Sequence, residues 1–267
     1  MIKRFFKKEA QKTPKIYLRF SENNDTEKLA KFYADHKHKD VFDRSQTYLQ
    51  ERIDTGDVIL MEDEAGEIIG ASVIYPLKGK DEHGRDVVKC QELGSLRIVK
   101  NGYMGLFNIL ISTQVFRTML VEPPEECIVA EIHKNVWPLA KNIGAIKWEP
   151  SKEVIESSDT TLDPEVLANY VPDTSEDGKK IWIQIPKESL PTVAQKLLEV
   201  VDRPVLKHKK FEENGEKIEI SLERVKFVDK FMDEIKAIAA SDLGDPEKAR
   251  PKQEMAALQR RWMKGLR

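Results

Sequence analysis

The sequence predicts a mixed α/β fold in which helices pack on one mixed β-sheet. Three observations support this fold class. A strand-like run and a glycine turn at residues 102–105 lead straight into a long apolar helical pattern. Two earlier apolar runs flank a short glycine-containing turn, which indicates an antiparallel hairpin. The short apolar run at residues 127–133 has the pattern of a buried parallel strand.

The elements of the first half follow in order. A strand at residues 16–20 precedes a helix whose start resembles a capping box at Asn24 and Glu27. A second helical run ends near residues 55–56. The expected hairpin strands lie at residues 57–62 and 67–75, a further strand at 87–99, and the long helix at 106–120, which Pro123 and Pro124 end.

The second half alternates strands and helices. After the strand at residues 127–133, Pro138 suits the first turn of a helix that Gly144 closes. Residues 146–148 and 180–185 are expected to form a hairpin. The acidic insert between them, residues 151–178, has two interpretations, a surface loop or a lid over an acceptor site.

The sequence divides into a basic leader at residues 1–14, a main domain at 15–186 and a C-terminal extension at 187–267. For the extension we expect a helix, a hairpin and a second helix, at residues 189–201, 205–222 and 225–240. Residues 244–267 carry seven Lys/Arg and three acids around an apolar stripe that includes Trp262. This tail is suited to docking on a partner protein, on the chain's own body or on an anionic surface.

Composition narrows the classes of function. The 267 residues are 40% hydrophobic and 34% charged, which allows a full core under a well-solvated surface. The formal net charge of −2 argues against a nucleic-acid-binding protein. No run approaches the roughly 20 apolar residues of a transmembrane segment, and no secretory signal is recognised. With only two cysteines, we expect a cytoplasmic protein with free thiols.

The glycine turn before the long helix predicts an anion site. The first backbone N–H groups of a helix have no partner within it, and the helix dipole adds partial positive charge there. Glycines allow a phosphate to approach the main chain closely. A phosphorylated cofactor is therefore expected at this turn.

The order of elements, with a glycine turn after the fourth strand and Asn135 after the fifth, resembles the GNAT superfamily of acyl-CoA-dependent N-acetyltransferases over residues 15–186. That superfamily carries Val, six variable residues, Gly, any residue, and Gly or Ala, with Arg or Gln three before the first Gly. Here Ile98 stands seven residues before Gly105, which matches the spacing. The turn departs from the pattern because Gly102 takes the Arg/Gln place and Phe107 the second small position.

The resemblance implies a binding site for acetyl-CoA or another acyl-CoA. Main-chain N–H groups of the turn and the first helical residues would wrap the CoA pyrophosphate. These residues are Gly102, Tyr103, Met104, Gly105 and Leu106. Backbone groups of Ile98 and Val99 would pair with the pantetheine arm as an added strand does. Asn135 would help hold the pantetheine end, or it is a simple helix cap.

Two residues are candidates for acid–base catalysis. Strand alternation puts Glu92 on the same face as Ile98, next to the cofactor turn. A carboxylate in an apolar strand can have a raised pKa that suits a general base, although Glu92 could equally be an edge carboxylate in solvent. His133, which shares a face with Glu131, is the second candidate, and its structural alternative is an ordinary strand histidine.

The resemblance implies an acyl-CoA-dependent N-acyltransferase that moves an acetyl group to an amine by direct attack in a ternary complex. The acceptor would be a small-molecule or protein amine. The general acid stays unassigned, because Asn142 stands where superfamily members often have Tyr. Tyr103 is a candidate substitute, and its alternative is a packing residue of the turn. Two alternatives stay open, a non-catalytic CoA-binding or protein-interaction module and a scaffold recruited through its basic ends. Without Cys/His pairs at ligand spacing, no metal is expected.

Overall fold

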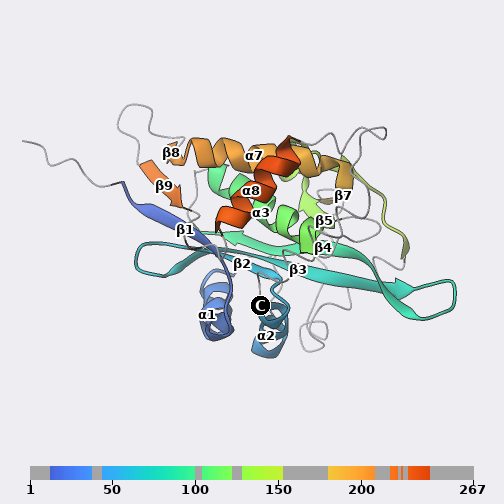
Figure 1. The fold of residues 1–267 in the computed structure, drawn as a ribbon. Helices are drawn as coiled ribbons and strands as arrows, with labels where there is room; N and C mark the ends of the chain where they lie inside the picture. Colours follow the sequence, from blue (N-terminus) through green and yellow to red (C-terminus); the bar gives the residue numbers. More distant parts are fainter. Residues whose placement is uncertain are drawn as a thin grey trace, which may run out of the picture.

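The structure is a computed structural model that describes residues 13–37, 44–99, 104–121, 128–152, 180–207, 217–221, 224 and 228–240. Within these ranges the strands form one mixed sheet in the order β6-β7-β5-β4-β3-β2-β1-β9-β8. Helices α1 and α2 cover one face of the sheet, and α3, α7 and α8 lie on the other (Figure 1). The predicted mixed α/β fold is confirmed.

The strands are β1 (Lys15–Phe20), β2 (Val58–Glu62), β3 (Ile68–Lys80), β4 (Asp86–Ile98), β5 (Ile128–His133), β6 (Ile146–Lys147), β7 (Lys180–Ile185), β8 (Val205–Lys207) and β9 (Lys217–Ser221). The helices are α1 (Thr26–Asp35), α2 (Gln46–Asp54), α3 (Met104–Val121), α4 (Trp137–Lys141), α7 (Leu190–Asp202) and α8 (Val228–Ala239). Short 3-10 turns stand at η1 (Asn23–Asp25), η2 (Lys134–Val136) and η4 (Lys187–Ser189). The long helix and both expected hairpins, β2–β3 and β6–β7, are present.

The start of the first helical segment differs from the sequence-based prediction. The carboxylate of Asp25 accepts a hydrogen bond from the backbone N–H of Glu22 at 2.7 Å, so the cap of the turn η1 is Glu22, two residues before the expected cap at Asn24. Asp25 is buried because it also binds Arg19. A tertiary ion pair therefore decides which residue opens the segment.

The sheet is buried on both faces at its centre, because β2 alternates between two cores. Ile59 and Met61 pack in the main core with α3, while Val58 and Leu60 pack against α1 and α2. Helix α3 is buried between the sheet and α7, and even its polar Thr113 is inaccessible. Within the described residues, none of the helices is sufficiently long and apolar for a bilayer span.

The C-terminal extension continues the sheet of the main domain. Strand β9 pairs in parallel with β1, and β8 pairs antiparallel with β9 at the sheet edge. Helix α7 packs on α3, and α8 packs on α7. The predicted helix–hairpin–helix order of this region is present, and its strands add to the existing sheet. The tail at residues 244–267 and the leader up to residue 12 lie outside the described residues.

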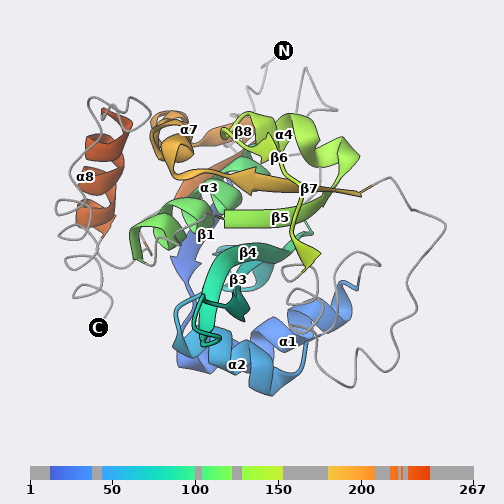
Figure 2. The ribbon, with the colours of Figure 1, turned by 90° about the vertical axis from the view of Figure 1, so that its right-hand side faces the viewer.

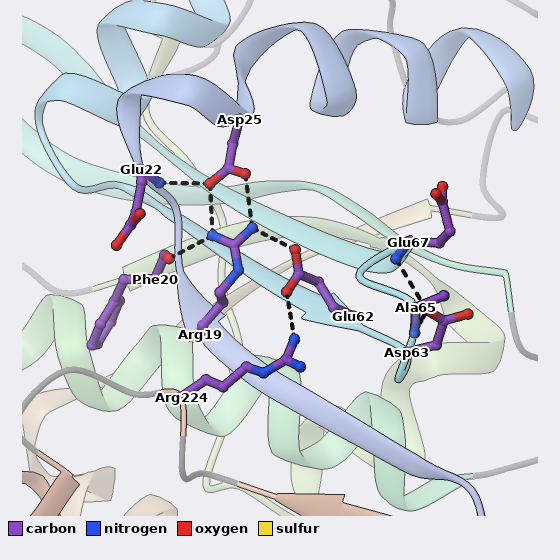
Figure 3. A network of polar contacts seen from close by, with 9 residues as sticks. All are labelled: Arg19, Phe20, Glu22, Asp25, Glu62, Asp63, Ala65, Glu67 and Arg224. Carbon is purple, nitrogen blue, oxygen red and sulfur yellow. Dashed lines mark hydrogen bonds and ion pairs between the residues drawn. The ribbon is translucent and has the colours of Figure 1, made fainter.

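A charge network ties the extension to β1 and β2 (Figure 3). Both terminal nitrogens of Arg19 donate to Asp25, at 2.6 and 2.7 Å, and one also donates to Glu62 at 2.5 Å. The other oxygen of Glu62 accepts from Arg224 at 3.2 Å. The guanidinium of Arg224 lies 3.7 Å from the ring centroid of Tyr17. One arginine of the extension thus binds two strands of the main domain.

Candidate functional site

The sheet opens between the neighbouring strands β4 and β5. These strands pair in parallel at two positions, Gln91 with Ile128 and Glu92 with Val129. Beyond them β5 continues beside β7, while β4 continues beside β3. In the described residues β4 and β5 therefore separate after Glu92. Figure 2 shows β4, β5 and β7 in succession, with α1 and α2 on the β3 and β4 side.

A bulge in β4 lies beside this opening. Val73 of β3 pairs with Gly94 of β4, and Ala71 of β3 pairs with Arg97 of β4. A step of two residues along β3 therefore corresponds to a step of three residues along β4. The extra residue follows Gly94, where Ser95 has a φ of 46°. A bulge of this kind reverses the alternation of side chains along the strand.

The predicted common face of Glu92 and Ile98 is therefore wrong. Glu92 pairs with Tyr75, which packs in the core under α1 and α2. Ile98 and Leu96 pack against the main core on the α3 face. The sequence-based alternation failed because one bulged residue separates the two halves of the strand.

The same register shows which backbone groups of β4 point to the opening. The N–H of Val99 donates to the carbonyl of Ile69 at 2.9 Å, so this N–H is engaged with β3. Because backbone groups alternate in direction along a strand, those of Ile98 point away from β3, toward the side where β5 has diverged. Of the two residues expected to pair with pantetheine, Ile98 has the available backbone orientation.

Helix α3 is the next element of the chain after β4, so its N-terminus follows the end of that strand. Its first turn contains Met104, Gly105 and Leu106, and Leu106 is fully buried. Gly102 and Tyr103 lie outside the described residues. Phe107, which takes the second small position of the superfamily pattern, packs its ring against the main core. The N-terminus of an 18-residue helix favours an anion through its unpaired N–H groups and dipole.

Buried hydrogen bonds fix α3 to the loop before β2. Arg117 donates to the carboxylate of Asp57 at 2.8 Å and to the carbonyl of Thr55 at 3.1 Å. Gln114 donates to the backbone carbonyl of Asp57 at 3.3 Å. Arg117 and Gln114 are buried, so these bonds form away from water. They hold the helix, and hence its N-terminus, at a defined position on the sheet.

Glu92 is half-buried at the point where β4 and β5 separate. Its neighbours across the strands are Tyr75 of β3 and Val129 of β5. His133 stands four residues farther along β5 than Val129, about 13 Å along the strand. The two catalytic candidates therefore share a sheet face without meeting.

One alternative for Asn135 was that it caps a helix, but in the structure His133 is the capping residue of the turn that contains Asn135. The Nδ1 atom of His133 accepts a hydrogen bond from the backbone N–H of Asn135 at 3.3 Å, which makes His133 the cap of the turn η2. The Asn135 residue is exposed within that turn. Asn135 is therefore not the helix cap. It lies directly after β5, in the turn η2. Glu131 binds Lys180 at 3.2 Å.

The residues that surround the bulge carry no functional signal in the sequence. The hydroxyl of Tyr33 donates to the carbonyl of Ser95 at 2.6 Å, and the hydroxyls of Tyr75 and Ser95 lie 2.5 Å apart. Tyr33 shares a helical stripe with Leu29 and Phe32, which in the sequence predicts only a core residue. A serine with positive φ leaves no sequence signal, because this conformation ordinarily favours glycine.

Arg97 is a second residue that the sequence did not single out. It follows the bulge on the face of β4 that α1 and α2 cover, opposite Ala71. Its buried Nε atom has no hydrogen-bond partner within the described part of the chain. Arg97 thus carries a positive charge on β4, seven residues before the first residue of α3. Within the same ranges, no three His, Cys, Asp or Glu side chains lie together as a metal site would require.

No family profile matches this sequence, and no curated protein does. Solved structures do match. One is a Mycobacterium tuberculosis protein in complex with CoA and NLQ, which is 11% identical, with a TM-score of 0.44, covering 63% of this chain and 98% of that chain. Another is a Sinorhizobium meliloti GNAT superfamily phosphinothricin acetyltransferase in complex with AcCoA, 18% identical, with a TM-score of 0.40, covering 49% of this chain and 75% of that chain.

A third is a Salmonella typhimurium protein described as a putative acetyltransferase with its cofactor acetyl-CoA. It is 15% identical, with a TM-score of 0.39, covering 50% of this chain and 81% of that chain. Such identities and TM-scores do not establish an activity.

Proposed function

We propose that this chain is an acyl-CoA-dependent N-acyltransferase that transfers an acetyl or other acyl group from CoA to an amine in a ternary complex. The observation that supports it is the opening of the sheet after Glu92 and Val129. On one side of the opening lies the backbone edge of β4, and the N-terminus of α3 follows it in the chain.

The proposed binding mode uses mostly main-chain groups. The amides of the pantetheine arm would hydrogen-bond to the backbone of Ile98 as an added strand does. The pyrophosphate would lie at the first turn of α3, against the N–H groups of Met104, Gly105 and Leu106. The turn residues Gly102 and Tyr103 would complete this cradle. Asn135, after β5, would hold the pantetheine end on the opposite side of the opening.

Arg97 supplies a charge that suits the same ligand. Its guanidinium precedes the turn and has a buried, unpartnered Nε within the described residues. An arginine offers several N–H donors in a fixed plane, which matches phosphate oxygens. We therefore include Arg97 among the residues that would bind the CoA phosphates.

Glu92 is the proposed general base. The acceptor enters as an ammonium ion, and Glu92 removes one proton. The amine nitrogen then attacks the thioester carbonyl. A C–N bond forms, the C–S bond breaks, and the CoA thiolate leaves and takes up the second proton that the attacking nitrogen loses. His133 is the second choice, because it caps a turn and lies farther along β5.

Calorimetric titration with acetyl-CoA tests the binding step, and thiol release with a panel of amines tests turnover. We expect a 1:1 complex and amine-dependent release of CoA. Glu92→Gln should keep acetyl-CoA binding and lower turnover by about 10²–10⁴-fold. Glu82→Gln is the matched control, because Glu82 is an exposed carboxylate in the β3–β4 turn.

The same two measurements separate the proposed enzyme from the other interpretations. Binding of acetyl-CoA without thiol release from any amine would favour a non-catalytic CoA-binding module. Absence of binding at saturating acetyl-CoA would contradict both. Turnover that survives Glu92→Gln and is lost in His133→Gln would move the base to His133.

A further inference from the structure

Ser95 has a backbone conformation that serine seldom adopts. Its φ of 46° lies in the left-handed region, where the Cβ atom crowds the backbone of any residue but glycine. Ser95 is the one residue other than glycine with a positive φ in the described part of the chain. Such a conformation persists only where surrounding contacts determine it.

Two tyrosine hydroxyls from separate elements make those contacts. Tyr33, on α1, donates to the carbonyl oxygen of Ser95 at 2.6 Å. Tyr75, on β3, lies 2.5 Å from the Ser95 hydroxyl. Both tyrosines are buried. The main chain and the side chain of Ser95 are therefore each held by one hydroxyl.

The ring of Tyr75 is itself held by close neighbours. It packs so closely on Gly94 that a Cβ atom at that position would lie 2.8 Å from the ring. The ring of Tyr48 stacks on it at 5.8 Å between centroids, and the Arg44 guanidinium lies 5.0 Å from the Tyr75 centroid. Burial raises the pKa of the Tyr33 and Tyr75 phenols, so both hydroxyls keep their protons at neutral pH.

The bulge at Ser95 determines how β4 presents its two functional parts. Before it, Glu92 faces the α1 and α2 side with Tyr75. After it, Ile98 packs toward α3, and its backbone points to the opening. If the extra residue were drawn back into regular pairing, every residue after it would change face.

We propose that Tyr33 and Tyr75 are positioning residues that hold the bulge at Ser95 in the conformation that binds acyl-CoA. This inference rests on the proposed function, because the ligand it concerns is the CoA thioester. Neither tyrosine touches the ligand in this scheme. Each acts through Ser95 on the backbone edge of β4.

The test removes hydroxyls and leaves rings. Tyr33→Phe should weaken acetyl-CoA binding by about 2- to 10-fold, which is the effect expected for one lost hydrogen bond. Tyr33→Phe with Tyr75→Phe should weaken it further. In steady-state kinetics the KM for acyl-CoA should rise while the KM for the amine stays unchanged. Tyr17→Phe is the control, because Tyr17 lies on β1 beside Arg224.

Rescue distinguishes positioning from simple packing. Glycine adopts positive φ without crowding, so Ser95→Gly should restore acetyl-CoA affinity in the Tyr33→Phe background. If Tyr33→Phe binds acetyl-CoA as tightly as the wild-type protein does, the positioning role is overturned and the proposed function stays intact. Failure of Ser95→Gly to rescue a weakened, folded Tyr33→Phe would have the same meaning. A wild-type protein that does not bind acetyl-CoA would overturn the proposed function, and the positioning role with it.

Discussion

Two strand pairs of the described sheet are parallel, β1–β9 and β4–β5, and they are completed in different ways. The β1–β9 pair extends over three positions and is reinforced by Arg224, which contacts Tyr17 and Glu62. The β4–β5 pair extends over two positions, after which the strands separate. The comparison shows that one short parallel pair lies beside a side-chain network that spans its strands, whereas the strands of the other diverge after two positions.

The network beside the β1–β9 pair is electrostatic, and it is buried at Arg19, Asp25 and Glu62. The side chains of Arg19, Asp25 and Glu62 are 15%, 3% and 5% exposed. Burial alone would raise the pKa of Asp25, but hydrogen bonds from Arg19 and from the Glu22 N–H, with the Arg19 charge, lower it below its usual value. The carboxylate form of Asp25 is therefore part of the folded state.

The largest effect is expected from Arg19→Met, which breaks the closed side of the comparison. It leaves two carboxylates buried without their common partner, at a cost of about 3–5 kcal/mol in the free energy of unfolding. Urea denaturation followed by circular dichroism measures it. Lys31→Met is the control, because the Lys31–Asp35 pair is exposed on α1. A loss as small as that of the control would show that Arg19 does not hold the network together.

Gly94→Ala should have the next largest effect, on the open side. The new methyl group would lie 2.8 Å from the buried Tyr75 ring, and overpacking of this kind costs about 1–3 kcal/mol. Because the ring also holds Ser95, acetyl-CoA affinity should fall as well. Gly66→Ala is a control without a steric contact, although its φ of 82° adds backbone strain. A Gly94→Ala protein that is destabilised but keeps its acetyl-CoA affinity would show that the packing of the Tyr75 ring contributes to stability and not to binding.

Extremes of pH should act on the two regions separately. Asp25 has a lowered pKa in the fold, so its contribution is complete above about pH 3.9, its unfolded value, and is lost as the pH falls through the folded pKa. The buried tyrosines behave in the opposite sense. Their raised pKa values stabilise the fold below about pH 10, and this contribution is lost as the pH rises through the folded values.

Phenolate absorbance during an alkaline titration measures the second effect. Burial raises the pKa of Tyr48 to about 12, and those of Tyr33 and Tyr75 are raised by burial as well. Three of the six tyrosines of the chain should therefore ionise late, together with unfolding. Six tyrosines that titrate together near pH 10 in the folded protein would contradict the burial of the Ser95 contacts.

The smallest effect is expected from Arg224→Gln. Its side chain is 38% exposed, so the pair with Glu62 is worth about 0.2–1 kcal/mol and should weaken as salt rises. The free energy of unfolding, measured at low and at high salt, gives the contribution of the ion pair and its dependence on salt. A large, salt-independent loss would mean that the contact with the Tyr17 ring, and not the ion pair, fastens the extension.

Much of the fold was predictable, because its signals are local. The strand pattern at residues 87–99 and the apolar helix after it gave the order of β4 and α3, and apolar runs around turns gave the hairpins. The bulge at Ser95 was not predictable. Its causes are hydroxyls from Tyr33 and Tyr75, which are distant in the sequence, and alternation alone placed Glu92 and Ile98 on one face.

The candidate site divides in the same way. Glu92 and the start of α3 lie on either side of the bulge, as the order of elements required. The role of His133 as a cap depends on one contact, between its ring and the Asn135 N–H, and histidine is not among the usual capping residues. Arg97 became a candidate only when its face was known and its Nε was found without a hydrogen-bond partner among the described residues.

The parallel pairing of β1 with β9 also has a consequence for the order of events during synthesis. Strand β1 is complete at Phe20, but β9 is complete only at Ser221. During translation the outer edge of β1 therefore has its N–H and C=O groups unpaired by β9 until most of the chain has been made. Such an edge is a template for pairing with another nascent chain. A chain truncated before residue 217 should aggregate from this edge, even though its main sheet is otherwise complete.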